Sequence, residues 1–125
     1  MRLALVLVVV AACHKPVDRT GDPAVGRWRG DTGKTIELRA DGTLDMEPIA
    51  TPECQNDDPL LAACKAREVW ARHDTIVALS RGAIASEPAH LGTAGTPCTC
   101  RLEVIDVQLR GDELVFGHEH AQRVK

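Results

Sequence analysis

The sequence predicts a mainly β domain, a small antiparallel meander that closes into a barrel and carries one short helix. Two observations predict it. Residues 35–40 and 43–47 alternate between apolar and polar side chains on either side of an Asp41-Gly42 pair, which is typical of a β-hairpin. Short runs of the same kind, separated by turn residues, follow as far as residue 120. A length of 125 residues is enough for one domain.

The first elements follow from local patterns. A strand is expected at residues 26–30, and the hairpin after it buries Ile36, Leu38, Leu44 and Met46 on one face. The hairpin therefore supplies part of the core.

The middle of the chain changes character. Asp58-Pro59 places an N-cap and a first-turn proline before an apolar run, which predicts a short helix as far as Arg67. A second strand pair is expected at residues 69–73 and 75–80, where the alternation returns.

The last third begins with a loop at residues 82–97, which are rich in Gly, Ala and Pro. A long strand at 100–109 follows, and its apolar face shifts partway along. The shift runs from Leu102 and Val104 to Ile105, Val107 and Leu109, which predicts a β-bulge. A turn at Gly111-Asp112 leads into a return strand at 113–120.

The first twelve residues are typical of a signal peptide. Met1-Arg2 carries a positive charge, and an unbroken apolar run follows to Ala12. The ten apolar residues at 3–12 would cover about 15 Å as a helix, against about 30 Å of bilayer hydrocarbon. The segment is therefore too short to span a membrane, and residues 1–12 are expected to be cleaved.

The residues around Cys13 resemble the bacterial lipobox, in which a branched apolar residue and two small residues precede a cysteine. They read Val10-Ala11-Ala12-Cys13. The resemblance implies cleavage before Cys13, a thioether-linked diacylglycerol on its sulfur and often a third acyl chain, such as palmitate, on its amine. The membrane would then be a partner through this lipid. An ordinary signal peptide, with Cys13 a chance residue or a disulfide partner, is the alternative.

The predicted organisation has three parts. Residues 1–12 are a signal peptide, 13–23 a polar, proline-containing lipidated tether, and 24–125 a single β-rich domain. The residue after Cys13 is His14, not the Asp that some bacteria read as an inner-membrane retention signal. We therefore expect a protein of the cell envelope, at the outer membrane, on its periplasmic or surface face.

The mature chain resembles the small lipocalin-like domains of bacterial envelope proteins. The likeness lies in Gly26-Arg27-Trp28, the turn at residues 40–43 and the closing hairpin at 110–114. It implies a barrel with Trp28 plugging one end. It supplies no ligand, because one fold serves many functions.

Four cysteines follow Cys13: they are Cys54, Cys64, Cys98 and Cys100. An even number in an exported chain favours two disulfides. Cys98 and Cys100 would point to the same face of a strand, so they are poorly placed to pair with each other. Two arrangements remain, each joining the 54–64 segment to the 98–100 strand.

A metal site is the alternative reading of these residues. Cys98 and Cys100 with His118 and His120 offer thiolate and imidazole ligands suited to copper or zinc. Their spacings match none of the usual zinc patterns, and an oxidising compartment favours disulfides.

Composition narrows the function classes. There is no Tyr and only one Phe, so an aromatic pocket for a flat cofactor is not expected and no cofactor is predicted. A net charge of −3 argues against a nucleic-acid partner. No serine lies in a nucleophile-elbow motif.

The leading hypothesis is a non-enzymatic binding or structural lipoprotein with a protein or small-molecule partner that the sequence does not identify. A metal-delivery protein and a hydrolase with an unrecognised site are the alternatives.

Overall fold

The computed structural model describes residues 17–86, 92, 95 and 97–125. This part of the chain is mainly β, with a nine-stranded sheet and one short helix. The strands are β1 Gly26–Gly30, β2 Thr35–Leu38, β3 Leu44–Asp45, β4 Ile49–Ala50, β5 Val69–His73, β6 Ile76–Ala85, β7 Thr99–Arg110, β8 Glu113–Phe116 and β9 Glu119–Arg123, and the helix is α2 Asp58–Lys65. The predicted fold class is confirmed.

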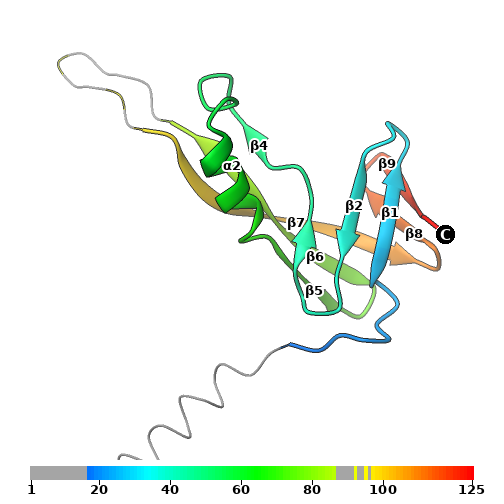
Figure 1. Ribbon diagram of the computed structural model, residues 1–125. Coiled ribbons are helices and arrows are strands. Elements are labelled where there is room, and N and C mark those ends of the chain that lie inside the picture. Colours follow the sequence, from blue (N-terminus) through cyan, green and yellow to red (C-terminus); the bar gives the residue numbers. More distant parts are fainter. Residues whose placement is uncertain (1–16, 87–91, 93–94, 96) are drawn as a thin grey trace, which may run out of the picture.

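The strands form one curled sheet, a half-barrel, in the order β3-β2-β1-β9-β8-β7-β6-β4, with β5 paired to β6 (Figure 1). The β3 and β5 edges meet at a single bridge between Thr43 and Val69. Two backbone hydrogen bonds flank the bridge. The amide of Leu44 donates to Glu68 O at 3.1 Å, and the amide of Trp70 donates to Gly42 O at 3.0 Å.

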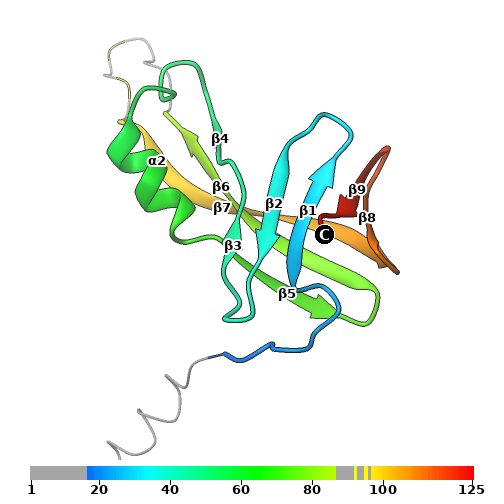
Figure 2. The ribbon, with the colours of Figure 1, turned by 45° about the vertical axis from the view of Figure 1, so that its right-hand side comes forward.

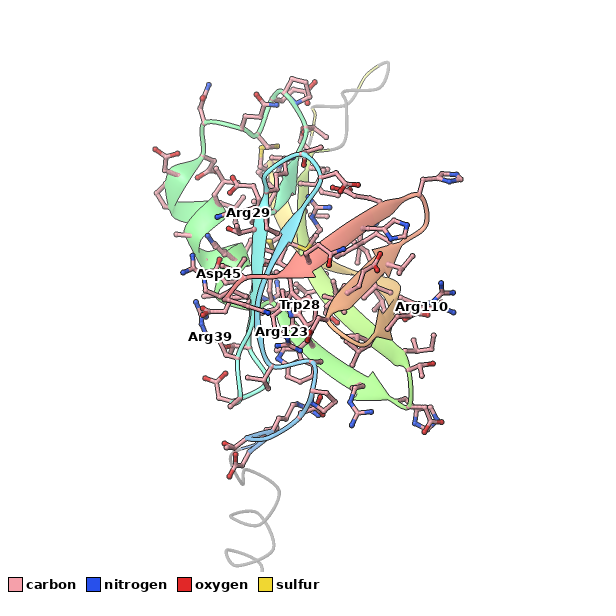
Figure 3. The ribbon with its side chains drawn as sticks, turned by 90° about the vertical axis from the view of Figure 1, so that its right-hand side faces the viewer. Trp28, Arg29, Arg39, Asp45, Arg110 and Arg123 are labelled. Carbon is pink, nitrogen blue, oxygen red and sulfur yellow. A yellow bond between two sulfur atoms is a disulfide. The ribbon has the colours of Figure 1, made fainter. Side chains whose placement is uncertain are left out.

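The half-barrel encloses an aliphatic core with two tryptophans. Trp28 on β1 is fully buried, and its indole N–H donates to Ala24 O at 3.1 Å. The guanidinium of Arg123 on β9 lies 4.3 Å from the centre of the same ring, close enough for a cation–π contact (Figure 3). The other buried residues of this barrel core are Ala24, Ile36, Leu38, Leu44, Trp70, Val77, Leu79, Val107, Leu114 and Ala121.

The predicted β2–β3 hairpin is confirmed, with a turn that its sequence explains. Gly42 has a φ of +87°, a left-handed conformation that glycine adopts without strain. The Asp41 carboxylate accepts hydrogen bonds from the amide and the hydroxyl of Thr43. The predicted helix is also confirmed, but its N-cap is Asp57, whose carboxylate accepts from Leu60 N at 3.3 Å.

The predicted bulge in the long strand is wrong. All ten residues of β6 pair with β7 in one unbroken antiparallel register, from Ile76 opposite Gln108 to Ala85 opposite Thr99. The apolar face shifts because the two ends of the hairpin are covered on opposite faces. Val77 and Val107 enter the barrel core, whereas Ile84 belongs to a second core beside α2 (Figure 1).

Two expected boundaries also change. The loop expected from residue 82 begins later, because β6 continues through Ala85. The expected single return strand at 113–120 is two strands, β8 and β9, that pair with each other. A turn separates them at Gly117-His118, where Gly117 has a φ of +57°.

Part of the segment predicted as a free tether is held against the domain (Figure 2). The amide of Arg19 donates to Ala40 O at 2.6 Å, and its guanidinium lies 5.0 Å from the centre of the Trp70 ring. Asp22 accepts from Arg72 Nε at 2.9 Å. Among the described residues, contacts with the domain are thus already made at Arg19, ahead of the boundary expected at residue 24. The predicted signal peptide and lipobox, including Cys13, lie outside the described residues.

Candidate functional site

Two disulfides define one end of the molecule. Cys54 pairs with Cys98 and Cys64 with Cys100, one of the two arrangements that the sequence left open. Cys54, Cys64 and Ile84 are buried together in the second core, and Leu60 and Leu61 of α2 pack against them. The bridges therefore fasten α2 and the segment before it to the end of the β6–β7 hairpin.

Gly82 on β6 allows the helix to come this close to the sheet. A Cβ at this position would lie 2.7 Å from Cys64 Sγ and 3.4 Å from Pro48 Cβ. Any side chain would therefore push the helix away from the strand.

The alternative metal set is not assembled. Cys98 and Cys100 are both in disulfides at one end of β7. His118 lies in the β8–β9 turn and His120 on β9. These two strands adjoin the other end of β7, near Gln108, so the histidines lie far along the sheet from the two cysteines. His120 contacts the carboxylate of Glu113 instead. Within the described residues no group of three or more His, Cys, Asp or Glu is placed to hold a metal ion.

A groove of about 750 Å³ lies between the β1–β2 hairpin and the connection from β3 to β4. Its wall on the helix side is completed by Lys65 of α2 and Arg81 of β6. The other lining residues are Arg27, Gly33, Lys34, Thr35, Ile36, Glu37, Asp45, Met46 and Glu47. Charged side chains therefore dominate the lining, and four of them are cationic.

Most of the groove's carboxylates already have partners. Asp45 lies 2.9 Å from Lys65 Nζ and 3.0 Å from an Arg39 nitrogen (Figure 3). The hydrogen bond from Lys65 lowers the pKa of Asp45 and raises that of Lys65. Glu37 accepts from Arg39 Nε at 2.9 Å. These two carboxylates are therefore largely neutralised.

Two cations of the β1–β2 hairpin are in a different situation. Arg27 and Lys34 are exposed, and neither forms an ion pair with another described residue. Arg81 donates from Nε to the backbone oxygen of Glu47 at 3.0 Å, which fixes it at the groove without neutralising its charge. The arrangement suits carboxylate or phosphate groups, which guanidinium and ammonium groups bind well.

A buried carboxylate fixes one side of the groove. Glu68 is fully buried, and its two oxygens accept from Met46 N at 3.2 Å and from Gly82 N at 2.8 Å. Burial raises the pKa of this carboxyl. Because Met46 lines the groove, Glu68 holds the β3–β4 connection against β6 at the point where the groove forms.

Sequence reasoning singled out none of the groove residues for binding. Arg27 belongs to the Gly26–Trp28 motif, which points to the fold and not to a ligand. Lys34, Lys65 and Arg81 come from different elements, so no local motif links them. The one available signal was the strict alternation in the hairpin, which places polar residues such as Glu37 and Asp45 on the face opposite the core.

Comparison with known protein families, characterised proteins and solved structures found no match for this chain. Separately, none of the helices within the described residues has the length and apolarity needed to cross a membrane.

Proposed function

We propose that this chain is a lipid-anchored protein of the bacterial cell envelope and a non-enzymatic binding module, whose groove takes a ligand carrying carboxylate or phosphate groups. The observation that carries the proposal is the groove itself. It combines Glu37 and Asp45, whose carboxylates are paired with cations, with Arg27 and Lys34, which form no ion pair with another described residue.

Three features support the anchor. Residues 1–13 have the charge, length and final cysteine of a lipoprotein signal. The other four cysteines are all in disulfides, which leaves Cys13 as the fifth cysteine for the lipid. Disulfides in a small domain are typical of an oxidising compartment such as the envelope.

The groove's size and chemistry support a binding role. A volume of about 750 Å³ is within the range of small-molecule and peptide sites. The ligand would add its negative charge beside Arg27, Lys34 and Arg81 without having to break an existing ion pair of the first two.

The anchor is tested by mass spectrometry of the full chain expressed in a bacterium and extracted from membranes with detergent. We expect the chain to begin at Cys13 and to carry a diacylglyceryl group, with the four other cysteines oxidised. A Cys13→Ser variant should lose the lipid and leave the membrane fraction. A chain that begins elsewhere, or a Cys13 without lipid, would refute the anchor.

The groove is tested with labelled hexaglutamate as an acidic probe and hexalysine as its basic counterpart, at low salt. We expect the purified protein to bind hexaglutamate in preference to hexalysine. The Arg27→Glu/Lys34→Glu variant should lose this preference. An Arg110→Glu variant, which reverses an exposed charge on β7 away from the groove, should keep it. Equal binding of both peptides, or no binding of either, would sink the anionic-ligand proposal.

A further inference from the structure

One long edge of the sheet has no partner strand among the described residues. β7 runs from Thr99 to Arg110 and pairs with β6 along ten residues. On its other side β8 pairs only with residues 108–110 (Figure 1). The stretch from Thr99 to Val107 is therefore an edge available for pairing with a further strand.

The ladder with β6 fixes which backbone groups point to this edge. The amide of Leu109 donates to Thr75 O at 2.7 Å, so the odd-numbered residues of β7 face β6. Even-numbered residues of β6 point the other way. Gly82 N donates to Glu68, and Ile84 O accepts from Thr51. By the same alternation, Leu102, Val104 and Asp106 direct their N–H and C=O groups to the unpaired side.

The side chains along this edge combine exposed apolar surface with ordered charge. Val104 is 66% exposed, the most exposed large apolar side chain among the described residues. Arg101 and Glu103 lie on the other face of the strand, 3.6 Å apart, with opposite charges on either side of Leu102. Such a sequence is complementary to itself when read in the antiparallel direction.

We propose that two copies of this chain associate by antiparallel pairing of their β7 edges about a two-fold axis at Leu102. Arg101 of each copy then lies opposite Glu103 of the other, at a position without backbone hydrogen bonds, where opposing side chains come closest. Cys100 and Val104 exchange backbone hydrogen bonds across the interface, and Val104 is covered.

The charges select this register over its neighbours. Moving the axis to Glu103 would place two glutamates opposite each other, and moving it to Arg101 would oppose two arginines, which is unfavourable. One existing contact lies at this edge, where a nitrogen of Arg67 donates a hydrogen bond to Cys100 O at 3.4 Å. That carbonyl retains a second lone pair for the incoming amide, so both bonds are compatible.

The test reverses the charges at positions 101 and 103 and measures association of the copies. Two differently tagged copies of the full chain are co-expressed, solubilised from the cell and co-purified, and their mass is measured by light scattering over a range of concentrations. Arg101→Glu and Glu103→Arg should each weaken self-association by about tenfold or more, because both cross-strand pairs become repulsive.

The two single variants should then associate with each other, since each glutamate at 101 or 103 of one faces an arginine of the other. The Arg101→Glu/Glu103→Arg chain should regain self-association. This rescue also shows that the variants fold. Arg110→Glu serves as the control and should associate like the natural chain. A monomer at all concentrations, or a dimer unaffected by these charge changes, would overturn the proposal, whatever the outcome for the anchor and the groove.

Discussion

At the scale of single residues, Glu68 is the one charged side chain buried within the described domain. It is fully buried, and it links β6 to the β3–β4 connection through two backbone amides. Its backbone oxygen also accepts from Leu44 beside the bridge that joins the two sheet edges. Glu68 thus links the β3 side of the sheet to β6, two parts that are otherwise joined there by a single β-bridge.

We predict that Glu68→Gln lowers the free energy of unfolding by about 1–3 kcal/mol, because one buried backbone amide would face the new side-chain N–H₂ group instead of an acceptor. Denaturant unfolding measures the change. Glu47→Gln, at an exposed position in the same region, is the control and should have little effect. A Glu68→Gln protein as stable as the natural one would contradict the bridging role.

Glu68 also predicts a pH dependence. Burial raises its pKa above the ordinary value of 4.5, so the folded state keeps this proton to a higher pH than the unfolded chain does. The associated stability is fully present below pH 4.5 and is lost as the pH rises through the raised pKa. The stability advantage of the natural chain over Glu68→Gln should therefore shrink from acid toward neutral pH. Unfolding curves across that range would show the opposite slope if the pKa were lowered.

At the scale of elements, the β6–β7 hairpin organises the molecule, because it contributes to two cores on opposite faces. The half of the hairpin farther from its own connection, which begins beside the β5–β6 turn at Asp74, completes the barrel core. Its other half carries α2 and both disulfides. The first half is flanked by β5 and β8, whereas beyond the hairpin the second half pairs only with the two-residue strand β4, so it depends more on the bridges.

We predict that removing the second bridge, with Cys64→Ala/Cys100→Ala, costs about 4 kcal/mol in the loop-entropy treatment. The bridged residues are 36 positions apart. Hydrogen exchange should show protection lost first in α2 and β4, with the barrel core around Trp28 opening later. Simultaneous loss of protection in both parts would mean that the two cores unfold as one unit.

The elements also show what a single sequence can predict. The β2–β3 hairpin and α2 were predicted because their signals are local, namely strict alternation around Asp41-Gly42 and a proline at a helix start. The shift of the apolar face along β7 was misread, because a bulge and a change of covering layer give the same pattern. Gly117 is the turn signal that divides the expected 113–120 strand in two.

The candidate site could not be predicted from the sequence, for a different reason. Arg27, Lys34, Lys65 and Arg81 come from four separate parts of the chain, and they line one groove only because the sheet curls. The disulfide partners were narrowed to two arrangements by a local argument, the shared face of Cys98 and Cys100. The choice between them depended on where α2 packs.

At the scale of the whole molecule, the N-terminal segment belongs to the fold. We predict that a chain beginning at Ala24 is about 1–2 kcal/mol less stable than one beginning at Val17, because it loses the part-buried Asp22–Arg72 ion pair and the Arg19–Trp70 contact. Thermal unfolding of the two chains measures the difference. Equal stability of the two chains would mean that residues 17–23 lie on the surface of the domain without stabilising it.

The attachment of Arg19 also sets the reach of the domain. Arg19 lies six positions after Cys13, and an extended chain covers at most about 3.3–3.6 Å per position, or about 20 Å in all. With a lipid on Cys13, the face around Ala40 and Trp70 would stay within that distance of the bilayer surface in every conformation of the link. The domain would then stay close to its own membrane, and a ligand or partner would have to approach that membrane surface to be bound.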